Sequence, residues 1–343
     1  MSRSNNSPAQ SFTVGIELTP DQPVSDMVSL AVTAESAALD AVFVSNHFDN
    51  RDPFQVLGAI ARHTDSVSLG PGVVNPYESH PVRLATQIAT VSEVAPGRVV
   101  CGIGAGDRAT LTKLGIEQDR PVSRTAEAIG IIRQLLGGET VNTRGIVSAQ
   151  GARLSFEPTA VPIYVGAQGP TMLRMAGVEA DGVLINGAHP VDYDHAIPHV
   201  RQGLSSREAP VDSFRTTGFV CTSLADDSDA AKHAATPPTA FITAGAPDQI
   251  IARHGIDTTR VERIRRALER GNHAEAYEAV TDQMRAAFCV AGTPERVKDR
   301  LIEIGAYVDA LVIGSPLGPD RTRAIELLAS ITDDIDDAQV LPS

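Results

Sequence analysis

The chain has 343 residues, of which 42% are hydrophobic, and its 29 basic and 42 acidic side chains give a formal charge of −13. This length allows a large buried core, and the acidic excess argues against a general affinity for nucleic acid or anionic lipid. No apolar run approaches the roughly 18 residues of a membrane span, and the first ten residues lack the apolar region of a signal peptide.

Eight short apolar segments alternate with helical patterns along the chain. From their β-branched and apolar runs we expect strands at residues 12–18, 41–47, 67–69, 99–103, 161–165, 181–186, 215–224 and 310–313. Apolar residues recurring every three or four positions predict helices at residues 23–38, 53–63, 79–95, 108–114, 123–136, 170–175, 190–203, from 293 onward, and 321–335. Pro81 and Pro294 suit the first helical position, and Thr293 is expected to cap its helix.

Two segments interrupt this alternation. Residues 137–160, with glycines and scattered polar residues, predict an excursion with a hairpin. Residues 226–288 have a mostly helical pattern, with breaks expected at Pro237-Pro238, Gly245-Ala246-Pro247 and Gly271-Asn272. Because this segment is too long for one crossover, we expect an inserted helical subdomain beside the barrel mouth, of the kind that acts as a lid.

Parallel strands need right-handed helical connections, so the alternation predicts a (β/α)₈ barrel, that is, a TIM barrel. We expect a single barrel domain at residues 12–337 with the insertion at about 226–288, a disordered lead-in at 1–11 and a tail at 338–343. Active sites of such barrels lie at the carboxyl ends of the strands. The residues expected there are Glu17, Asn46, His47, Gly72, Asn75, Gly104, Asp107, Gln168 and Asn186.

Residues 69–75 have the composition of a strand end that faces a ligand. Gly70 and Gly72 around Pro71 allow unusual backbone conformations and close approach, and Asn75 offers an amide that donates and accepts hydrogen bonds. An ordinary surface turn has the same composition. Similar glycine junctions recur at residues 102–107, 166–170 and 314–319. This recurrence at strand ends favours a binding site.

The glycine junctions allow two interpretations as phosphate sites. Residues 102–106 fit a dinucleotide fold poorly, because the third glycine comes one residue early and three strand-helix units precede it. Residues 166–171 fit phosphate better, because free N–H groups at a helix N-terminus bind anions. Phosphate sites of barrels more often follow the seventh and eighth strands, which counts against this interpretation.

Several catalytic patterns are missing from the sequence. Cys101, Cys221 and Cys289 form no Cys-x-x-Cys pair, and no zinc-binding His-Glu motif or Gly-x-Ser-x-Gly turn occurs. We therefore expect no metal site, and a reducing cytoplasm fits the cysteines best.

Glu17, Asp107 and His47 each allow two interpretations. Either carboxylate could serve a structural salt bridge or cap, and the imidazole could pack and bond to the backbone. Their position at barrel strand ends equally favours an acid, an orienting group or a contact to a cofactor ring.

Blocks spread from about residue 12 to residue 335 resemble the 5,10-methylenetetrahydromethanopterin reductases of the bacterial-luciferase-like superfamily. The resemblance is carried, in order, by Gly15-Ile16-Glu17, Ser45-Asn46-His47, residues 69–77 (LGPGVVNPY), 102–107 (GIGAGD), 115–117 with 121–123, 165–170 (VGAQGP), 181–186 (DGVLIN) and 314–320 (GSPLGPD).

The resemblance implies a barrel that binds the deazaflavin coenzyme F420 at the carboxyl strand ends. It also implies a cis peptide bond at Gly72-Val73, with a bulge that presses on the back of the ring. By position, the cofactor-binding residues would be Asn46, His47, Gly72, Val73, Asn75, Gly104, Ala105, Gly106 and Asn186, with Gly166, Ala167 and Gln168 near the phosphate. The family usually has aspartate where this chain has Asn46, so Glu17 becomes the preferred acid and Asp107 the second catalytic candidate.

The implied reaction is hydride transfer from reduced F420 to 5,10-methylenetetrahydromethanopterin, or a related methylene-tetrahydropterin or folate, giving the 5-methyl form. The methylene bridge must open to an iminium before it accepts hydride, and protonation of one bridge nitrogen promotes that opening. We expect Glu17 to supply the proton.

Other functions stay open at this point. They are another F420-dependent dehydrogenase acting on a sugar phosphate or alcohol, an FMN-dependent luciferase-like monooxygenase, and a non-catalytic barrel subunit, which Asn46 favours and the intact glycine junctions disfavour. The expected partner is a small-molecule pterin or folate carrier, with no nucleic acid and no membrane. A cytoplasmic homodimer or homotetramer is the family expectation.

Overall fold

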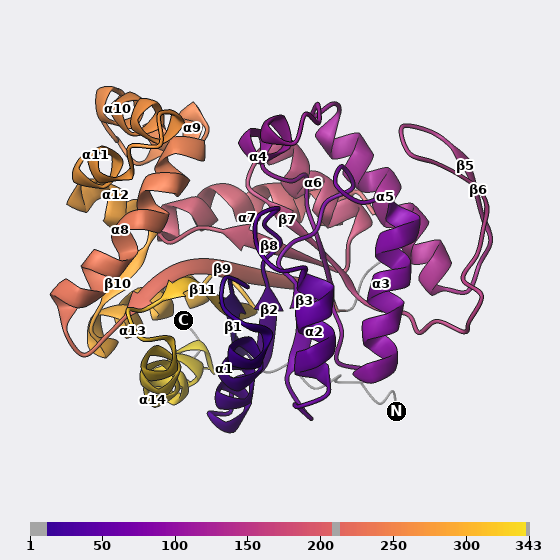
Figure 1. Ribbon diagram of the computed structural model, residues 1–343, viewed down its shortest axis with the longest axis horizontal. Helices are drawn as coiled ribbons and strands as arrows, with labels where there is room; N and C mark the ends of the chain where they lie inside the picture. The colour runs from indigo at the N-terminus through magenta and orange to yellow at the C-terminus, as the bar shows by residue number, and fades with distance from the viewer. Residues whose placement is uncertain (1–11, 208–212, 341–343) are drawn as a thin grey trace, which may run out of the picture.

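The computed structural model describes residues 12–207 and 213–340, and it is a (β/α)₈ barrel (Figure 1). Its eight parallel strands are β1 Thr13–Leu18, β2 Ala41–Val44, β3 Ser68–Pro71, β4 Cys101–Ile103, β7 Ile163–Ala167, β8 Gly182–Asn186, β9 Arg215–Leu224 and β11 Ala310–Leu317. Their order around the sheet is β3-β2-β1-β11-β9-β8-β7-β4. The predicted fold class is confirmed, because each of the eight expected strands is present and neighbours its successor.

The barrel closes between β3 and β4, where pairing is least regular. After β3 ends, the N–H of Val74 donates to the carbonyl of Gly102 at 3.0 Å, and the N–H of Gly104 donates to the carbonyl of Val74 at 2.8 Å. At the other end of the seam Leu69 pairs with Val99. This seam holds the chain that follows β3 against the end of β4.

Helices cover the outside of the barrel, and many of them begin with proline. They are α1 Val24–Ser36, α2 Pro53–Ala61, α3 Pro81–Val94, α4 Arg108–Lys113, α5 Pro121–Leu136, α6 Pro170–Glu179, α7 Pro190–Ser205, α13 Pro294–Gly305 and α14 Arg321–Val340. Proline suits the first helical position because the missing N–H would have no partner there. Among residues 12–207 and 213–340, none of the helices is long and apolar enough to cross a membrane.

The cap predicted for α13 differs in the structure. Thr293 precedes the helix, but its side chain makes no capping hydrogen bond. The Glu295 backbone N–H and the Thr293 hydroxyl instead hydrogen-bond the Glu295 carboxylate, and both lower the pKa of Glu295. The hydroxyl is therefore turned toward a side chain of the first turn.

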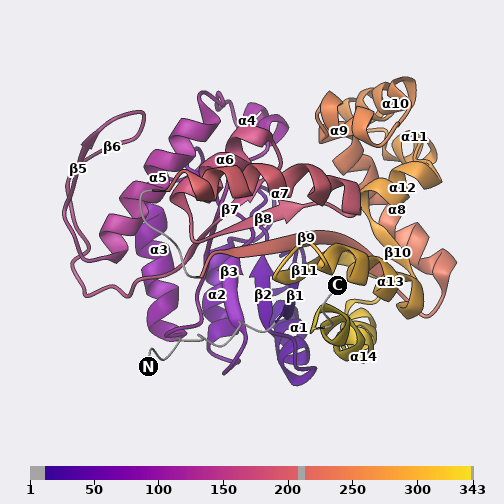
Figure 2. The same ribbon diagram turned by 180° about the vertical axis from the view of Figure 1, so that it is seen from behind.

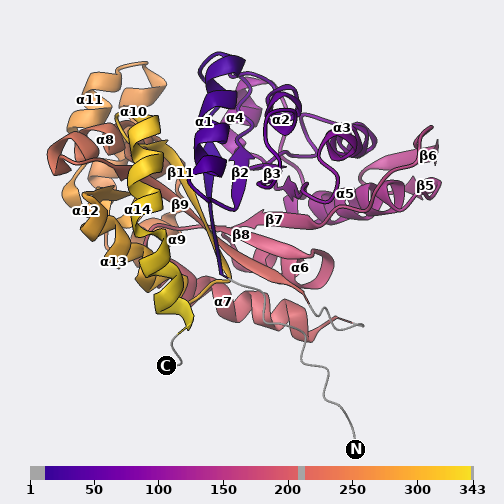
Figure 3. The same cartoon turned by 90° about the horizontal axis from the view of Figure 1, so that it is seen from below.

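Two excursions lie on opposite sides of the barrel in all three views (Figures 1, 2 and 3). One is the predicted hairpin, of antiparallel strands β5 Val141–Arg144 and β6 Ser148–Ala152. The other is the helical segment α8 Ser228–Gly245, α9 Asp248–Arg253, α10 Thr258–Glu269, α11 His273–Glu278 and α12 Asp282–Phe288. Ile251, Ile264 and Met284 belong to its own apolar cluster. We propose that this segment is an insertion in a single barrel domain.

The structure differs from the sequence prediction at one place in the insertion and at one place just after it. The break expected at Pro237-Pro238 was wrong, because α8 runs through both residues. Proline removes a backbone donor and crowds the preceding turn, so packing must hold this helix, and Ala235 and Ala240 are fully buried on it. Strand β10 Val290–Gly292, paired with β9, was missed because three residues carry no readable pattern.

Side chains fill the barrel beneath its carboxyl end. Phe43, Leu184 and Val312 form a buried cluster, and Phe219 packs against it. The rings of Phe43 and Phe219 meet edge to face with their centroids 6.1 Å apart. The strand ends therefore stand above an apolar floor.

Candidate active site

The carboxyl strand ends carry all the residues predicted for the site. Glu17 and Asn75 are buried, whereas His47, Asp107, Gln168 and Asn186 are exposed. The structure links three groups of them by contacts. Val73 lies beside Gly104 and Gly166, and Asn46 is joined to Asn75 through Glu78. Gln168 Nε2 donates a hydrogen bond of 3.0 Å to the Asn186 carbonyl.

Residues 72–73 lie between the end of β3 and the bridge of Val74 to Ile103, and this segment is called the bulge below. Glycines on the neighbouring strands make room for it. The Gly72–Val73 peptide bond is cis, as the resemblance implied. A Cβ atom on Gly104 would lie 2.8 Å from Val73 Cγ2, and one on Gly166 would lie 3.3 Å from the same atom. A Cβ on Gly72 would lie 3.1 Å from the Phe219 ring. Val73 is therefore seated between strand ends that have no side chains at the contact.

Glu17, at the end of β1, is a buried carboxylate with 5% of its surface exposed. Its Oε2 accepts a hydrogen bond from the Ser315 N–H at 2.8 Å, and its Oε1 lies 3.5 Å from the Thr19 hydroxyl. A Cβ on Gly314 would lie 3.4 Å from Glu17 Oε2 and 3.7 Å from the Phe219 ring. Phe219 therefore lies close to both Gly72 in the bulge and Gly314 beside Glu17.

Two asparagine amides meet at one carboxylate beyond the ends of β2 and β3. Asn75 Nδ2 donates to Glu78 Oε1 at 2.8 Å, and Asn46 Nδ2 donates to Glu78 Oε2 at 3.3 Å. The Gly106 turn, with φ of 72°, closes against the Asn75 amide. Gln118 Nε2 holds this turn by donating to the carbonyls of Ala105 and Gly106 at 2.9 and 3.0 Å.

The N-terminus of α6 adjoins the end of β7. Gly169 occupies the N-cap position, and no side chain caps the helix. Pro170 has no N–H to cap, so the N–H groups of the next residues point to the strand ends without a side-chain acceptor. Such groups stabilise a bound anion.

The model of the luciferase-like monooxygenase family matches residues 9–312 of the sequence. The chain belongs to this luciferase-like family.

Two relatives of this luciferase-like protein are similar over nearly their full length. It is 39% identical to the 5,10-methylenetetrahydromethanopterin reductase of Archaeoglobus fulgidus, over 92% of this chain and 96% of the relative. It is 38% identical to the enzyme of that name from Methanolobus tindarius, over 92% and 98%. Among solved structures, the coenzyme F420 dependent tetrahydromethanopterin reductase from Methanopyrus kandleri superposes with a TM-score of 0.87, at 33% identity, over 95% of this chain and 99% of that one.

Asp107 and His47 are exposed in this luciferase-like protein. Asp107 is the N-cap residue of α4, and its Oδ2 accepts from the Thr110 N–H at 2.7 Å. This is the cap that the sequence allowed as one of two interpretations. His47 follows β2 with an exposed side chain. The cap accounts for the position of the Asp107 carboxylate, whereas its role as a second catalytic residue stays a prediction.

Replacing Asp107 with alanine is expected to lower the free energy of unfolding by about 1 kcal/mol, through loss of the cap. Asparagine caps as well as aspartate, so Asp107→Asn should keep both stability and turnover. Urea unfolding and a steady-state assay measure the two quantities. A large loss of turnover in Asp107→Asn with unchanged stability would make Asp107 a catalytic residue.

Sequence reasoning missed three residues of the site in this luciferase-like protein. Glu78 and Gln118 follow motifs that were singled out, but no pattern showed where their side chains point. Ser315 lies in the glycine junction at residues 314–319, and that pattern does not predict that its N–H bonds Glu17 across 298 residues of sequence. One signal was readable, because Glu78 is three residues after Asn75, the spacing of an asparagine turn.

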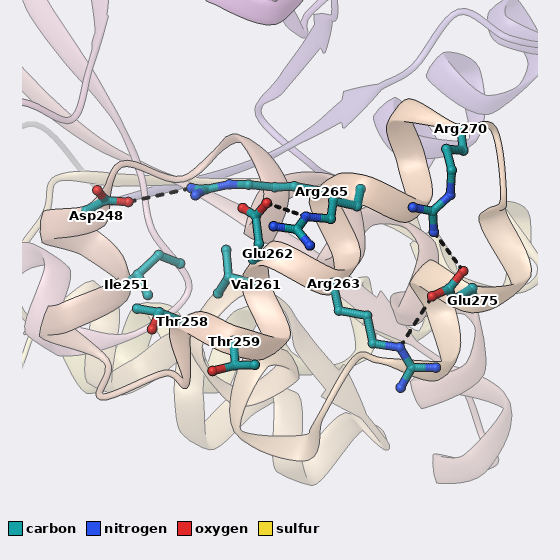
Figure 4. A pocket seen from close by; sticks show the side chains of 11 residues that line it. Asp248, Ile251, Thr258, Thr259, Val261, Glu262, Arg263, Arg265, Arg270 and Glu275 are labelled. Atoms are coloured by element: carbon teal, nitrogen blue, oxygen red, sulfur yellow. Dashed lines mark hydrogen bonds and ion pairs between the residues drawn. The ribbon is translucent and has the colours of Figure 1, made fainter.

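Two hollows lie away from the carboxyl ends of the strands, and neither is lined by a predicted site residue. Figure 4 shows the first, of about 770 Å³, in the helical insertion. Its arginines are paired: Arg265 with Asp248, Arg266 with Glu262, and both Arg263 and Arg270 with Glu275. Paired guanidinium groups leave this hollow poorly suited to an anion. The second, of about 660 Å³, lies at the amino ends of the strands, beside Thr13 and Tyr164.

Proposed function

We propose that the protein reduces 5,10-methylenetetrahydromethanopterin, or a related methylene-tetrahydropterin or folate, to the 5-methyl form with reduced coenzyme F420. One observation carries the proposal: relatives named 5,10-methylenetetrahydromethanopterin reductase match the chain over 96 and 98% of their own length. The solved reductase from Methanopyrus kandleri, which is similar to this chain over 95% of its length, is coenzyme F420 dependent.

The strand ends fit a deazaflavin. The protruding backbone at Val73 would support one face of a planar ring, the amides of Asn46 and Gln168 would donate and accept hydrogen bonds, and the N-terminus of α6 would receive the phosphate. We propose as cofactor-binding residues Asn46, His47, Gly72, Val73, Asn75, Gly104, Ala105, Gly106, Gly166, Ala167, Gln168 and Asn186. When bound, reduced F420 supplies a hydride from its C5 carbon.

Glu17 is our proposed proton donor. The Ser315 N–H already occupies Oε2, so the transferable proton would be held on Oε1. Burial excludes water from this carboxyl group, which lets it deliver its proton to a positioned bridge nitrogen rather than to solvent. The apolar floor formed by Phe219 and its neighbours keeps the same region dry from below.

The test is the anaerobic oxidation of reduced F420 with methylene-tetrahydromethanopterin and methylene-tetrahydrofolate supplied in turn. We expect one or both carriers to be reduced, with loss of substrate matched by formation of the 5-methyl product. Absorbance of the purified protein distinguishes a bound flavin, which has two visible bands. F420 binding without turnover of either carrier would favour a different F420-dependent dehydrogenase, and FMN binding would favour a monooxygenase.

We further propose that the protein acts in the cytoplasm, as a homodimer or homotetramer, on a small-molecule carrier, without nucleic acid or membrane. The charge of −13 supports the last point, because a strongly acidic protein is repelled by both. Sedimentation of the purified protein with and without F420 tests the subunit number, and a monomeric boundary at micromolar concentration would contradict it.

A further inference from the structure

The carboxylate of Glu78 connects three segments at the mouth of the barrel. Asn75 follows β3, Asn46 follows β2, and Glu78 lies just before α3. The Nδ2 atoms of both asparagines donate to it, one to each oxygen, at 2.8 and 3.3 Å. Glu78 has no role in the function proposed above.

The amide of Asn75 has only one possible direction. Its Oδ1 accepts from the backbone N–H groups of Tyr77 at 3.1 Å and Glu78 at 3.0 Å, so its Nδ2 must face the Glu78 carboxylate. A Cβ on Gly106 would lie 3.0 Å from Asn75 Cγ, and Asn75 is 4% exposed. Asn75 is therefore the fixed part of the group, and it holds Glu78 Oε1 in place.

Asn46 in turn takes its orientation from Glu78. Because Asn46 Nδ2 donates to Glu78 Oε2, its Oδ1 points away from the carboxylate, where it can accept a hydrogen bond from a ligand. Both partners of Glu78 are neutral amides, so they hold its negative charge without neutralising it. The strand end at residue 46 thus presents an uncharged acceptor, with a negative charge directly behind it.

We propose that Glu78 is a positioning residue of the cofactor site. Its carboxylate carries the negative charge at the ends of β2 and β3 that Asn46 does not carry, and it orients the Asn46 amide with its oxygen toward the ligand. The identity of the ligand as F420 rests on the proposed function, whereas the coupling of Glu78 to Asn46 does not.

Exchanging the two groups tests the proposal. Asn46→Asp alone puts two carboxylates at hydrogen-bond distance, where their charges repel each other. Glu78→Gln alone leaves one amide nitrogen facing another, so a hydrogen bond is lost. We expect each single variant to weaken F420 binding about tenfold. In the double variant the new carboxylate at position 46 can accept from the new amide nitrogen at position 78, whose oxygen still accepts from Asn75. The double variant should therefore bind F420 within about threefold of the unmodified protein.

Fluorescence titration with F420 and thermal unfolding of the ligand-free protein are the two measurements. We expect both single variants to lower the unfolding midpoint and the double variant to recover it. Glu93→Gln, on the exposed face of α3, is the matched control for loss of a carboxylate and should change neither quantity.

The two measurements separate the possible results. If the double variant lost F420 affinity by a factor equal to the product of the two single losses, the two residues would act independently and the proposal would be overturned. Recovery of the unfolding midpoint with no change of affinity in any variant would reduce Glu78 to a structural role. If the unmodified protein bound no F420, the proposed function would fail, and recovery of the midpoint would still decide whether Glu78 orients Asn46.

Discussion

Glu17→Gln is expected to lower turnover by about a hundredfold or more and to leave the affinity for F420 nearly unchanged. Glutamine keeps the size of the side chain, and its oxygen can still accept from the Ser315 N–H, so the fold around it should persist. What glutamine lacks is an acidic proton that it could transfer from the position of Oε1. Single-turnover oxidation of reduced F420 by the methylene carrier measures the step directly.

Asp107→Asn is the matched control for this experiment, because it makes the same carboxylate-to-amide change at another strand end. Its turnover should stay near that of the unmodified protein. Equal turnover in Glu17→Gln and the unmodified protein would remove Glu17 from the mechanism. A parallel loss of F420 binding would instead make Glu17 a structural part of the cofactor site.

Gly102→Ala is expected to lower the free energy of unfolding by about 3 kcal/mol or more, because the added methyl group overpacks the closing seam of the barrel. A Cβ on Gly102 would overlap the Pro71 carbonyl oxygen and lie 3.2 Å from Val73 Cγ1. Both neighbours are fixed, one by the backbone of β3 and the other by the bulge. Relief of the overlap must move β3 away from β4 at the place where Val74 N–H bonds the Gly102 carbonyl.

Gly58→Ala provides the contrast within the same barrel. Gly58 lies inside α2, and a Cβ there would meet no atom within 4 Å. Alanine should raise the free energy of unfolding by about 0.4 to 1 kcal/mol, because it restricts the unfolded chain. Urea unfolding of the two variants measures the difference, and a Gly102→Ala protein as stable as Gly58→Ala would show that the seam is not tightly packed.

The bulge and the glycines around it connect the stability of the barrel to the proposed chemistry. Gly102 clears the Pro71 carbonyl, whereas Gly104 and Gly166 clear the side chain of Val73. From the sequence, these glycines are candidates for close approach to a phosphate or ring. In the structure a Cβ on each of them would meet the Pro71 carbonyl or the Val73 side chain, so these glycines make room for the bulge.

The helical insertion and the strand that follows it show where sequence reasoning fails. Two adjacent prolines predicted a break that α8 does not have, since burial of Ala235 and Ala240 outweighs the local cost of proline. Strand β10 gave no signal because three residues are too few for alternation to show. In both cases tertiary contacts decided the backbone against its local preference.

The sequence by itself determined the barrel, the order of its strands and the strand ends at which the site residues gather, because apolar periodicity and helical crossovers act along the chain. It also carried the resemblance that implied the cis bond at Gly72-Val73. Only the tertiary structure decided which groups meet at those ends. Ser315 bonds Glu17, and Glu78 joins Asn46 to Asn75. Such pairs depend on barrel closure and on side-chain direction across separate strands, and neither has a signature in local sequence.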